Sequence, residues 1–209
     1  MQLLLASASE RRLTWLKENF NDFEIISKPL ISEEKSINYG VDVKQQSLEI
    51  CFSKAESAAL EWESRELNDN KNPDIIIVSD TLVEDPDDSK IALGKPMDNL
   101  DATNMLLRLS GKRHKVWSST AILVKNNKNY SKLATNWYYK IWTDFAIVEF
   151  CDLGDDDIFS LIENNSWVGK AGSYDLAGPA GQYTSIIEGS EETVLGFSNR
   201  AIVELRNLI

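Results

Sequence analysis

The sequence predicts an α/β protein with a mixed sheet. Runs of apolar, often β-branched residues alternate along the chain with segments in which apolar side chains recur every three or four residues, so strands and helices interleave. Of the 209 residues, 43% are apolar and 26% charged, as is typical of folded proteins, and we find no internal repeat or low-complexity segment. We therefore expect a single domain over residues 1–209.

The first elements are a strand, a turn and a helix. An apolar run covers residues 2–6, and apolar side chains then recur at helical spacing. Ser7 and Ser9 are both suitable helix caps, so the helix is expected to start at one of them. A second short strand is expected at residues 23–26.

The middle of the chain contains a long helix and a buried strand. The helical pattern extends over residues 42–67. The continuous Ile and Val run at 75–78 is typical of a strand that is covered on both faces, and it is expected to stop at Asp80 and its neighbours. Residues 82–84 and 91–93 flank an acidic, turn-rich tip and predict a hairpin.

Further helices and strands follow in alternation. A helix is expected over 99–109, where Asp98 or Asn99 can cap its start. Residues 116–124 and 138–150 are expected to be paired strands, with the aromatic segment 125–141 as an extension of their hairpin. A helix near 155–164 and a final helix capped by Ser198 complete the pattern.

Charge and composition exclude several classes of protein. The 33 acidic residues outnumber the 22 basic ones and give a net charge of −11, which argues against a general binder of nucleic acids or membranes. The single histidine, His114, excludes a multi-histidine metal site. Cys51 and Cys151 are far apart and are expected to be buried thiols. No apolar run resembles a signal sequence or a membrane span, so we expect a cytoplasmic protein.

One polar cluster at a strand end favours anions. Ser7 and Ser9 supply hydroxyls, the start of the helix supplies free N–H groups, and Arg11 and Arg12 supply fixed charges suited to phosphate oxygens. The alternative is an ordinary capped helix with two solvated arginines.

A second cluster is acidic. Asp80 follows the buried strand, where an aspartate is a metal ligand, a general base or a turn residue. Glu33 and Glu34 could bring a second carboxylate to the same Mg²⁺ or Mn²⁺ ion, or could form a solvated acidic loop. Lys54 and Lys95 are candidate phosphate ligands, although a lysine beside an apolar helix face or between Gly and Pro is more often a plain surface cation.

Several short motifs together indicate a family. They are S-x-S-x-R-R at 7–12, K-A at 54–55, D-T at 80–81, G-K-P at 94–96, L-S-G-x-x-H-x-V at 109–116, G-K-A-G-x-Y at 169–174, and G-S followed by V-x-G within 189–196. With these motifs in this order, the chain resembles the Maf family of nucleoside-triphosphate pyrophosphatases, which are related in fold to inosine triphosphate pyrophosphatase.

This resemblance implies a twisted mixed sheet in two lobes around a central cleft, and a homodimer. It implies that water attacks the α-phosphate of a nucleoside triphosphate with the help of Mg²⁺ or Mn²⁺, releasing pyrophosphate. The implied metal ligands are Asp80 with Glu33 or Glu34, and the implied catalytic residues are Asp80, Lys95 and Arg12. The implied substrate-binding residues are Ser7, Ser9, Arg11, Arg12, Lys54, Thr81 and Lys95. The basic residues among them are expected to gather in the cleft together with Lys170. His114 is expected to make a structural hydrogen bond.

The base preference follows from two positions. Many members have Y-G-I-Q-G where this chain has residues 174–178, so Ala177 replaces a glutamine thought to contact the base. Thr81 matches the branch that acts on dTTP and UTP, and modified nucleotides are a second substrate class. The alternative function is a non-catalytic, nucleotide-binding regulator of cell division with the same fold.

Overall fold

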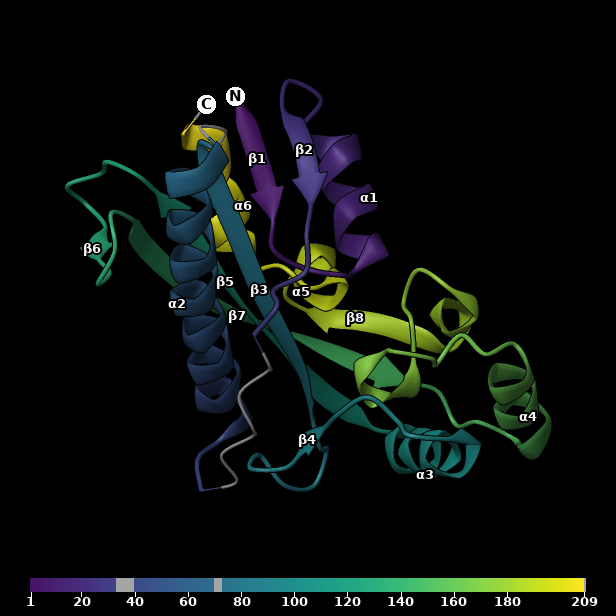
Figure 1. Cartoon of the computed structure of the whole chain (residues 1–209). Coiled ribbons are helices and arrows are strands. Elements are labelled where there is room, and N and C mark those ends of the chain that lie inside the picture. The colour runs from purple at the N-terminus through teal and green to yellow at the C-terminus, as the bar shows by residue number, and fades with distance from the viewer. Residues whose placement is uncertain (33–39, 70–72, 209) are drawn as a thin grey trace.

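The strands form one mixed sheet in the order β2-β1-β3-β5-β7-β6, with β4 on β3 and β8 on β7. The computed structural model describes residues 1–32, 40–69 and 73–208 (Figure 1). The strands are β1 (Gln2–Leu5), β2 (Glu24–Ser27), β3 (Ile75–Glu84), β4 (Ala92–Leu93), β5 (Arg113–Val124), β6 (Ser131–Lys132), β7 (Tyr138–Phe150) and β8 (Thr184–Glu188). β1 runs parallel to β2 and β3, whereas β5 runs antiparallel to both of its neighbours, β3 and β7, so the predicted mixed sheet is confirmed.

Helices cover both faces of the sheet. They are α1 (Glu10–Asn19), α2 (Val43–Asp69), α3 (Asn99–Leu109), α4 (Asp155–Glu163), α5 (Glu191–Leu195) and α6 (Asn199–Asn207), with short 3-10 turns η1 (Ala171–Ser173) and η2 (Pro179–Tyr183). Within the described ranges, none of these helices combines the length and the apolar composition needed to cross a bilayer.

The alternation of side chains along β1 separates two cores. Leu4 packs with the α2 side of the sheet, whereas Leu3 and Leu5 pack with α1 and α6 on the opposite side. All three leucines are fully buried, because successive side chains of a strand point to opposite faces and here each face is covered by helices.

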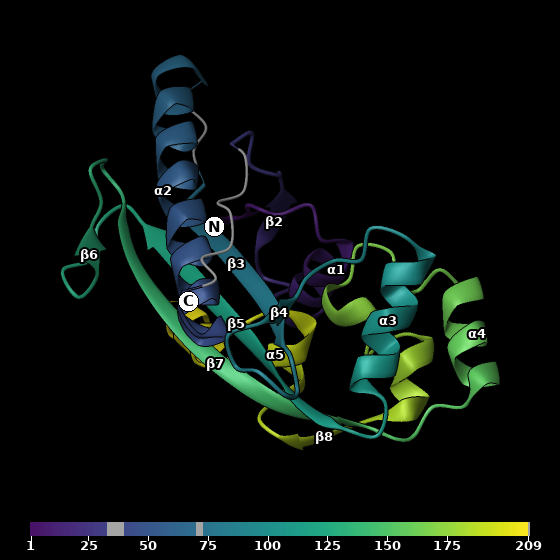
Figure 2. The same ribbon diagram turned by 90° about the horizontal axis from the view of Figure 1, so that it is seen from below.

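A second lobe is built on the far halves of the long strands. α3, α4, β8 and the glycine-dense segment of residues 169–181 pack there, away from the first lobe with α1 and α2, as the two perpendicular views show (Figures 1 and 2). Their buried side chains include Leu106 of α3 and Leu161 of α4, which join Val116 and Phe150 of the sheet in one core. The expected two-lobed arrangement is therefore present.

The prediction for the third strand was wrong at its end. β3 does not stop at Asp80 but continues to Glu84, because its antiparallel partner β5 continues beside it and pairs Asp80 with Ser119. Only the parallel partner ends early, since β1 pairs with β3 as far as Ile77. Asp80 therefore lies inside a strand, just beyond the end of its parallel neighbour.

Other expectations met mixed outcomes. The hairpin of β3 with β4 and the long pair of β5 with β7 are confirmed, and β6 continues that second hairpin. Cys51 is buried as predicted, but Cys151 is exposed, because it follows the last residue of β7 at the surface. β8 and α5 were not predicted.

Candidate active site

A cleft of about 660 Å³ lies between the lobes. Its walls come from the β1–α1 turn, α2, β3, the link between β4 and α3, and the glycine-dense segment. Every described residue that the sequence predicted for the site lines it, and these are Ser7, Ser9, Arg11, Arg12, Lys54, Asp80, Thr81 and Lys95. Glu33 and Glu34 lie outside the described residues.

The β1–α1 turn presents the start of a helix to the cleft. Ser9 is the N-cap of α1, and its Oγ accepts a hydrogen bond from the Arg12 N–H over 3.4 Å. Ser7 stabilises the turn before it, since its Oγ accepts from the Ser9 N–H over 3.1 Å. This turn leaves the carboxyl end of β1, where α/β sheets commonly bind ligands.

The two arginines of α1 have different surroundings. Arg12 Nε donates to the carbonyl of Gly196 over 2.9 Å, and its Nη atoms donate to the Ser79 carbonyl and to Thr81 Oγ1 over 3.2 and 2.9 Å. Arg12 thus connects α1 to β3 and to the end of α5. Arg11 instead donates from Nη1 to Asp175, and its buried Nε has no hydrogen-bond partner within the described ranges.

Buried hydroxyl groups fix the floor of the cleft behind Arg12. Ser79 Oγ donates to the Gly196 carbonyl over 2.6 Å, and Ser118 Oγ donates to the Thr193 carbonyl over 2.7 Å. Thr81 Oγ1 and Ser118 Oγ are 2.7 Å apart, so the residue that receives Arg12 is itself held by β5. Ser79 and Ser118 were not predicted, because the partners of a buried serine depend on strand pairing.

Lys54 and Asp80 form an ion pair in the cleft. Lys54 Nζ lies 2.8 Å from Asp80 Oδ1, and the two side chains are only 15% and 10% exposed. α2 packs along β3, which places a lysine at the edge of its apolar face beside this strand. Asp80 Oδ2 is buried and has no hydrogen-bond partner among the described residues, so half of the carboxylate is left for a ligand.

The second lobe contributes cations to the opposite wall. Lys95 is exposed in the link after β4, and Lys170 precedes η1. Asp175 pairs with Lys170 over 2.8 Å and with Arg11 over 3.1 Å. Burial raises the pKa of Asp175, but the hydrogen bond from Lys170 and the charge of Arg11 outweigh it and hold the pKa below its usual range. Asp175 was not predicted as a site residue, although it stands where many members of the family have a glycine.

His114 has a structural partner. Its Nε2 lies 2.8 Å from the hydroxyl of Tyr174, and both residues are buried. Burial lowers the pKa of His114 to about 4 and raises that of Tyr174, so both groups stay neutral near pH 7. Tyr174 lines the cleft and His114 does not, in agreement with the expected structural role of the histidine.

Comparisons with known proteins agree with this architecture. The Maf-like protein family matches residues 2–207. A protein of Clostridium acetobutylicum named dTTP/UTP pyrophosphatase is 34% identical over 94% of this chain and 92% of its own length, and one of Clostridium botulinum strain Kyoto with the same name is 36% identical over 93% and 90%.

A solved structure shares the fold at low sequence identity. A HAM1 protein from Coxiella burnetii matches all of this chain and 98% of its own, with a TM-score of 0.50 and 14% identity. The predicted likeness to the inosine triphosphate pyrophosphatase fold is therefore confirmed at the level of fold. Because the family match extends over nearly the whole chain and the relatives exceed 30% identity, the chain belongs to the Maf-like protein family.

Proposed function

We propose that this protein hydrolyses nucleoside triphosphates to nucleoside monophosphates and pyrophosphate, with dTTP and UTP as preferred substrates. The observation that carries the proposal is the buried Lys54–Asp80 pair, whose Asp80 Oδ2 has no described protein partner, in a cleft lined with arginines and lysines. The relatives named dTTP/UTP pyrophosphatase support the choice of reaction and bases.

In the proposed reaction, water attacks the α-phosphorus and the bond to the oxygen that bridges to the β-phosphorus breaks. Lys54 fixes Asp80 through Oδ1, so Oδ2 is available to take the proton of the attacking water. Arg11, Lys95 and Lys170 offset the charge on the phosphate oxygens and on the leaving pyrophosphate. Arg12 acts mainly by holding the cleft floor in place, since its donors already have protein acceptors.

A divalent cation fits the donor chemistry of the site. Within the described ranges no group of three or more His, Cys, Asp or Glu side chains could enclose a metal, but the unpartnered Asp80 Oδ2 is a suitable single ligand, as the alternative to its role as the base. Asp80 with Glu33 or Glu34 would hold Mg²⁺ or Mn²⁺, because both ions prefer oxygen ligands. When bound, the ion would supply charge neutralisation at the phosphates.

The base preference is proposed from the cleft and the relatives. Thr81 lines the cleft, whereas Ala177 is exposed and is not among the lining residues. A lost glutamine contact at position 177 therefore does not argue against turnover.

The test is a panel of canonical and modified nucleoside triphosphates with Mg²⁺ or Mn²⁺ and identification of the products. We expect pyrophosphate and the monophosphate, with dTTP and UTP turned over fastest. Asp80→Asn should lower kcat by several orders of magnitude while nucleotide binding persists, because the general base is lost. Asp87→Asn is the matched control, since Asp87 also pairs with a lysine over 2.7 Å but lies outside the cleft.

Orthophosphate as the direct product would contradict the reaction. Binding without turnover would favour the regulator of cell division instead. The homodimer and the cytoplasmic location are further proposals, which sedimentation of the purified protein and cell fractionation test.

A further inference from the structure

Asp175 connects cations from the two lobes. Its Oδ1 accepts a hydrogen bond from Arg11 Nη1 over 3.1 Å, and its Oδ2 lies 2.8 Å from Lys170 Nζ. Arg11 belongs to α1 in the first lobe, whereas Lys170 and Asp175 belong to the glycine-dense segment of the second lobe. Both cations line the cleft, but Asp175 is not among the lining residues. One carboxylate from outside the lining therefore engages two cleft cations.

This carboxylate is built into its loop. The Ala177 N–H donates to Asp175 Oδ1 over 3.2 Å, and the Asp175 side chain is only 16% exposed. Its two cations keep the carboxyl group ionised, as the lowered pKa indicates. Many members of the family have a glycine at this position, so the acidic side chain departs from that pattern.

The hydrogen bonds to Asp175 resemble those that a phosphate group makes. Carboxylate and phosphate oxygens both accept charge-assisted hydrogen bonds from Arg and Lys, and they compete for the same donors. Arg12, by contrast, is engaged by the carbonyls of Gly196 and Ser79 and by Thr81. Arg11 and Lys170 share one acidic partner, Asp175, and a bound phosphate could replace that partner at both cations.

We propose that Asp175 is an internal anion that competes with the phosphates of the substrate for Arg11 and Lys170, and so sets the affinity of the cleft for polyphosphate. The competition weakens binding of substrate and of the pyrophosphate product alike, which favours product release. The inference rests on the proposed function only for the identity of the substrate, because any polyphosphate anion would meet the same competition.

The test measures binding of inorganic tripolyphosphate by titration calorimetry, which requires no turnover. We expect Asp175→Asn to bind it about tenfold more tightly than the natural protein, since a competing charge is removed while the shape of the side chain is kept. Asp175→Glu should stay near the natural affinity, and Asp87→Asn, which removes an exposed carboxylate paired with Lys112, should change nothing. Equal or weaker binding by Asp175→Asn overturns the proposal.

A second pair of variants isolates the lysine. Lys170→Met should weaken binding only slightly in the natural protein, where Asp175 already neutralises Lys170, but strongly in the Asp175→Asn protein. Equal effects in both proteins would also overturn the proposal. If Asp175→Asn fails to fold, Asp175→Gly replaces it, because glycine occupies this position in the family pattern. If Asp175→Asn binds tripolyphosphate more tightly but no nucleotide is hydrolysed, this inference stands and the proposed function fails. If nucleotides are hydrolysed but Asp175→Asn binds tripolyphosphate no more tightly, the proposed function stands and this inference fails.

Discussion

Replacing Gly196 by alanine should destabilise the protein by about 2.5–5 kcal/mol. Gly196 ends α5 with a φ of +117°, which costs an L-residue roughly 1–2 kcal/mol. A Cβ there would lie 2.6 Å from Arg12 Nε, so the guanidinium must move. The hydrogen bond from Arg12 Nε to the Gly196 carbonyl would then be lost, which costs about 1.5–3 kcal/mol for a charged donor.

Two other glycines separate the cost of backbone strain from the cost of the contact with Arg12. Gly169 has a φ of +72° but open space around a Cβ, so Gly169→Ala should cost only the backbone strain of about 1–2 kcal/mol. Gly94 has neither a positive φ nor a neighbour within 4 Å of a Cβ, so Gly94→Ala should be nearly neutral. Urea unfolding gives the free energy of unfolding for each variant. If Gly196→Ala costs no more than Gly169→Ala, the contact with Arg12 contributes nothing.

Further predictions concern pH, thiols and a helix cap. The pKa of His114 is about 4 in the folded protein against 6.5 ordinarily, so the unfolded chain binds the proton first as the pH falls. Urea unfolding should therefore show that the free energy of unfolding falls by about 3 kcal/mol between pH 6.5 and 4. An equally steep fall with pH in the His114→Gln variant would contradict this. A thiol reagent should modify exposed Cys151 in the folded protein but reach Cys51 only after unfolding, because Cys51 is buried and burial, with the charge of Asp80, raises its pKa to about 12. Ser198→Ala should cost about 2 kcal/mol in urea unfolding, because Ser198 Oγ accepts from the Ala201 N–H and donates to Asp144.

Local signals predicted most helices and strands. Asp98 caps α3 because its carboxylate accepts the Asp101 N–H over 2.8 Å, an interaction between residues three positions apart. Ser9 and Ser198 cap α1 and α6 in the same way. Signals of this kind lie within one turn of chain, so a single sequence is enough to find them.

The errors came from interactions between distant segments. The end of β3 depends on β5, which pairs Asp80 with a residue almost forty positions away. The acid that engages Arg11 lies 164 positions along the chain. Neither partner can be found from spacing alone, whereas the family motifs predicted that the candidate site residues lie together in one cleft.

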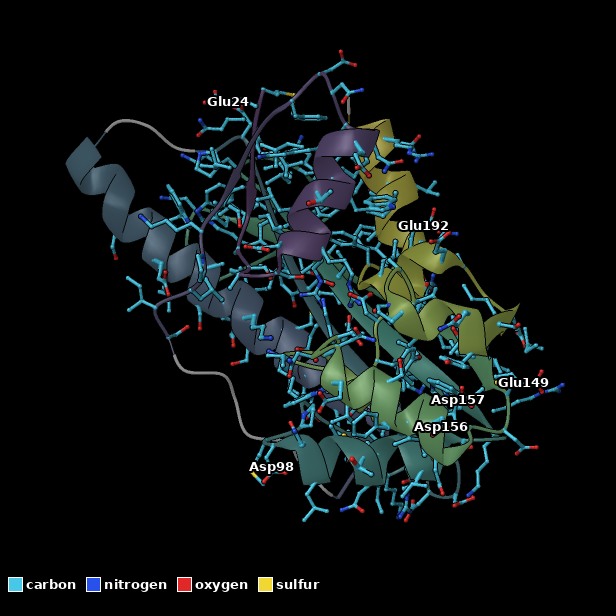
Figure 3. The ribbon with its side chains drawn as sticks, turned by 90° about the vertical axis from the view of Figure 1, so that its right-hand side faces the viewer. Glu24, Asp98, Glu149, Asp156, Asp157 and Glu192 are labelled. Carbon is cyan, nitrogen blue, oxygen red and sulfur yellow. The ribbon has the colours of Figure 1, made fainter. Side chains whose placement is uncertain are left out.

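The net charge of −11 describes the outside of the molecule rather than its cleft. The described cleft residues include the cations Arg11, Arg12, Lys54, Lys95 and Lys170 against the carboxylates Glu10 and Asp80. The carboxylates labelled in Figure 3, such as Glu24, Asp98 and Glu192, lie instead at the periphery of the molecule. An extended polyanion would meet that acidic periphery, which repels it. A single triphosphate needs cations only within the cleft, so a strongly acidic chain remains compatible with a small anionic substrate.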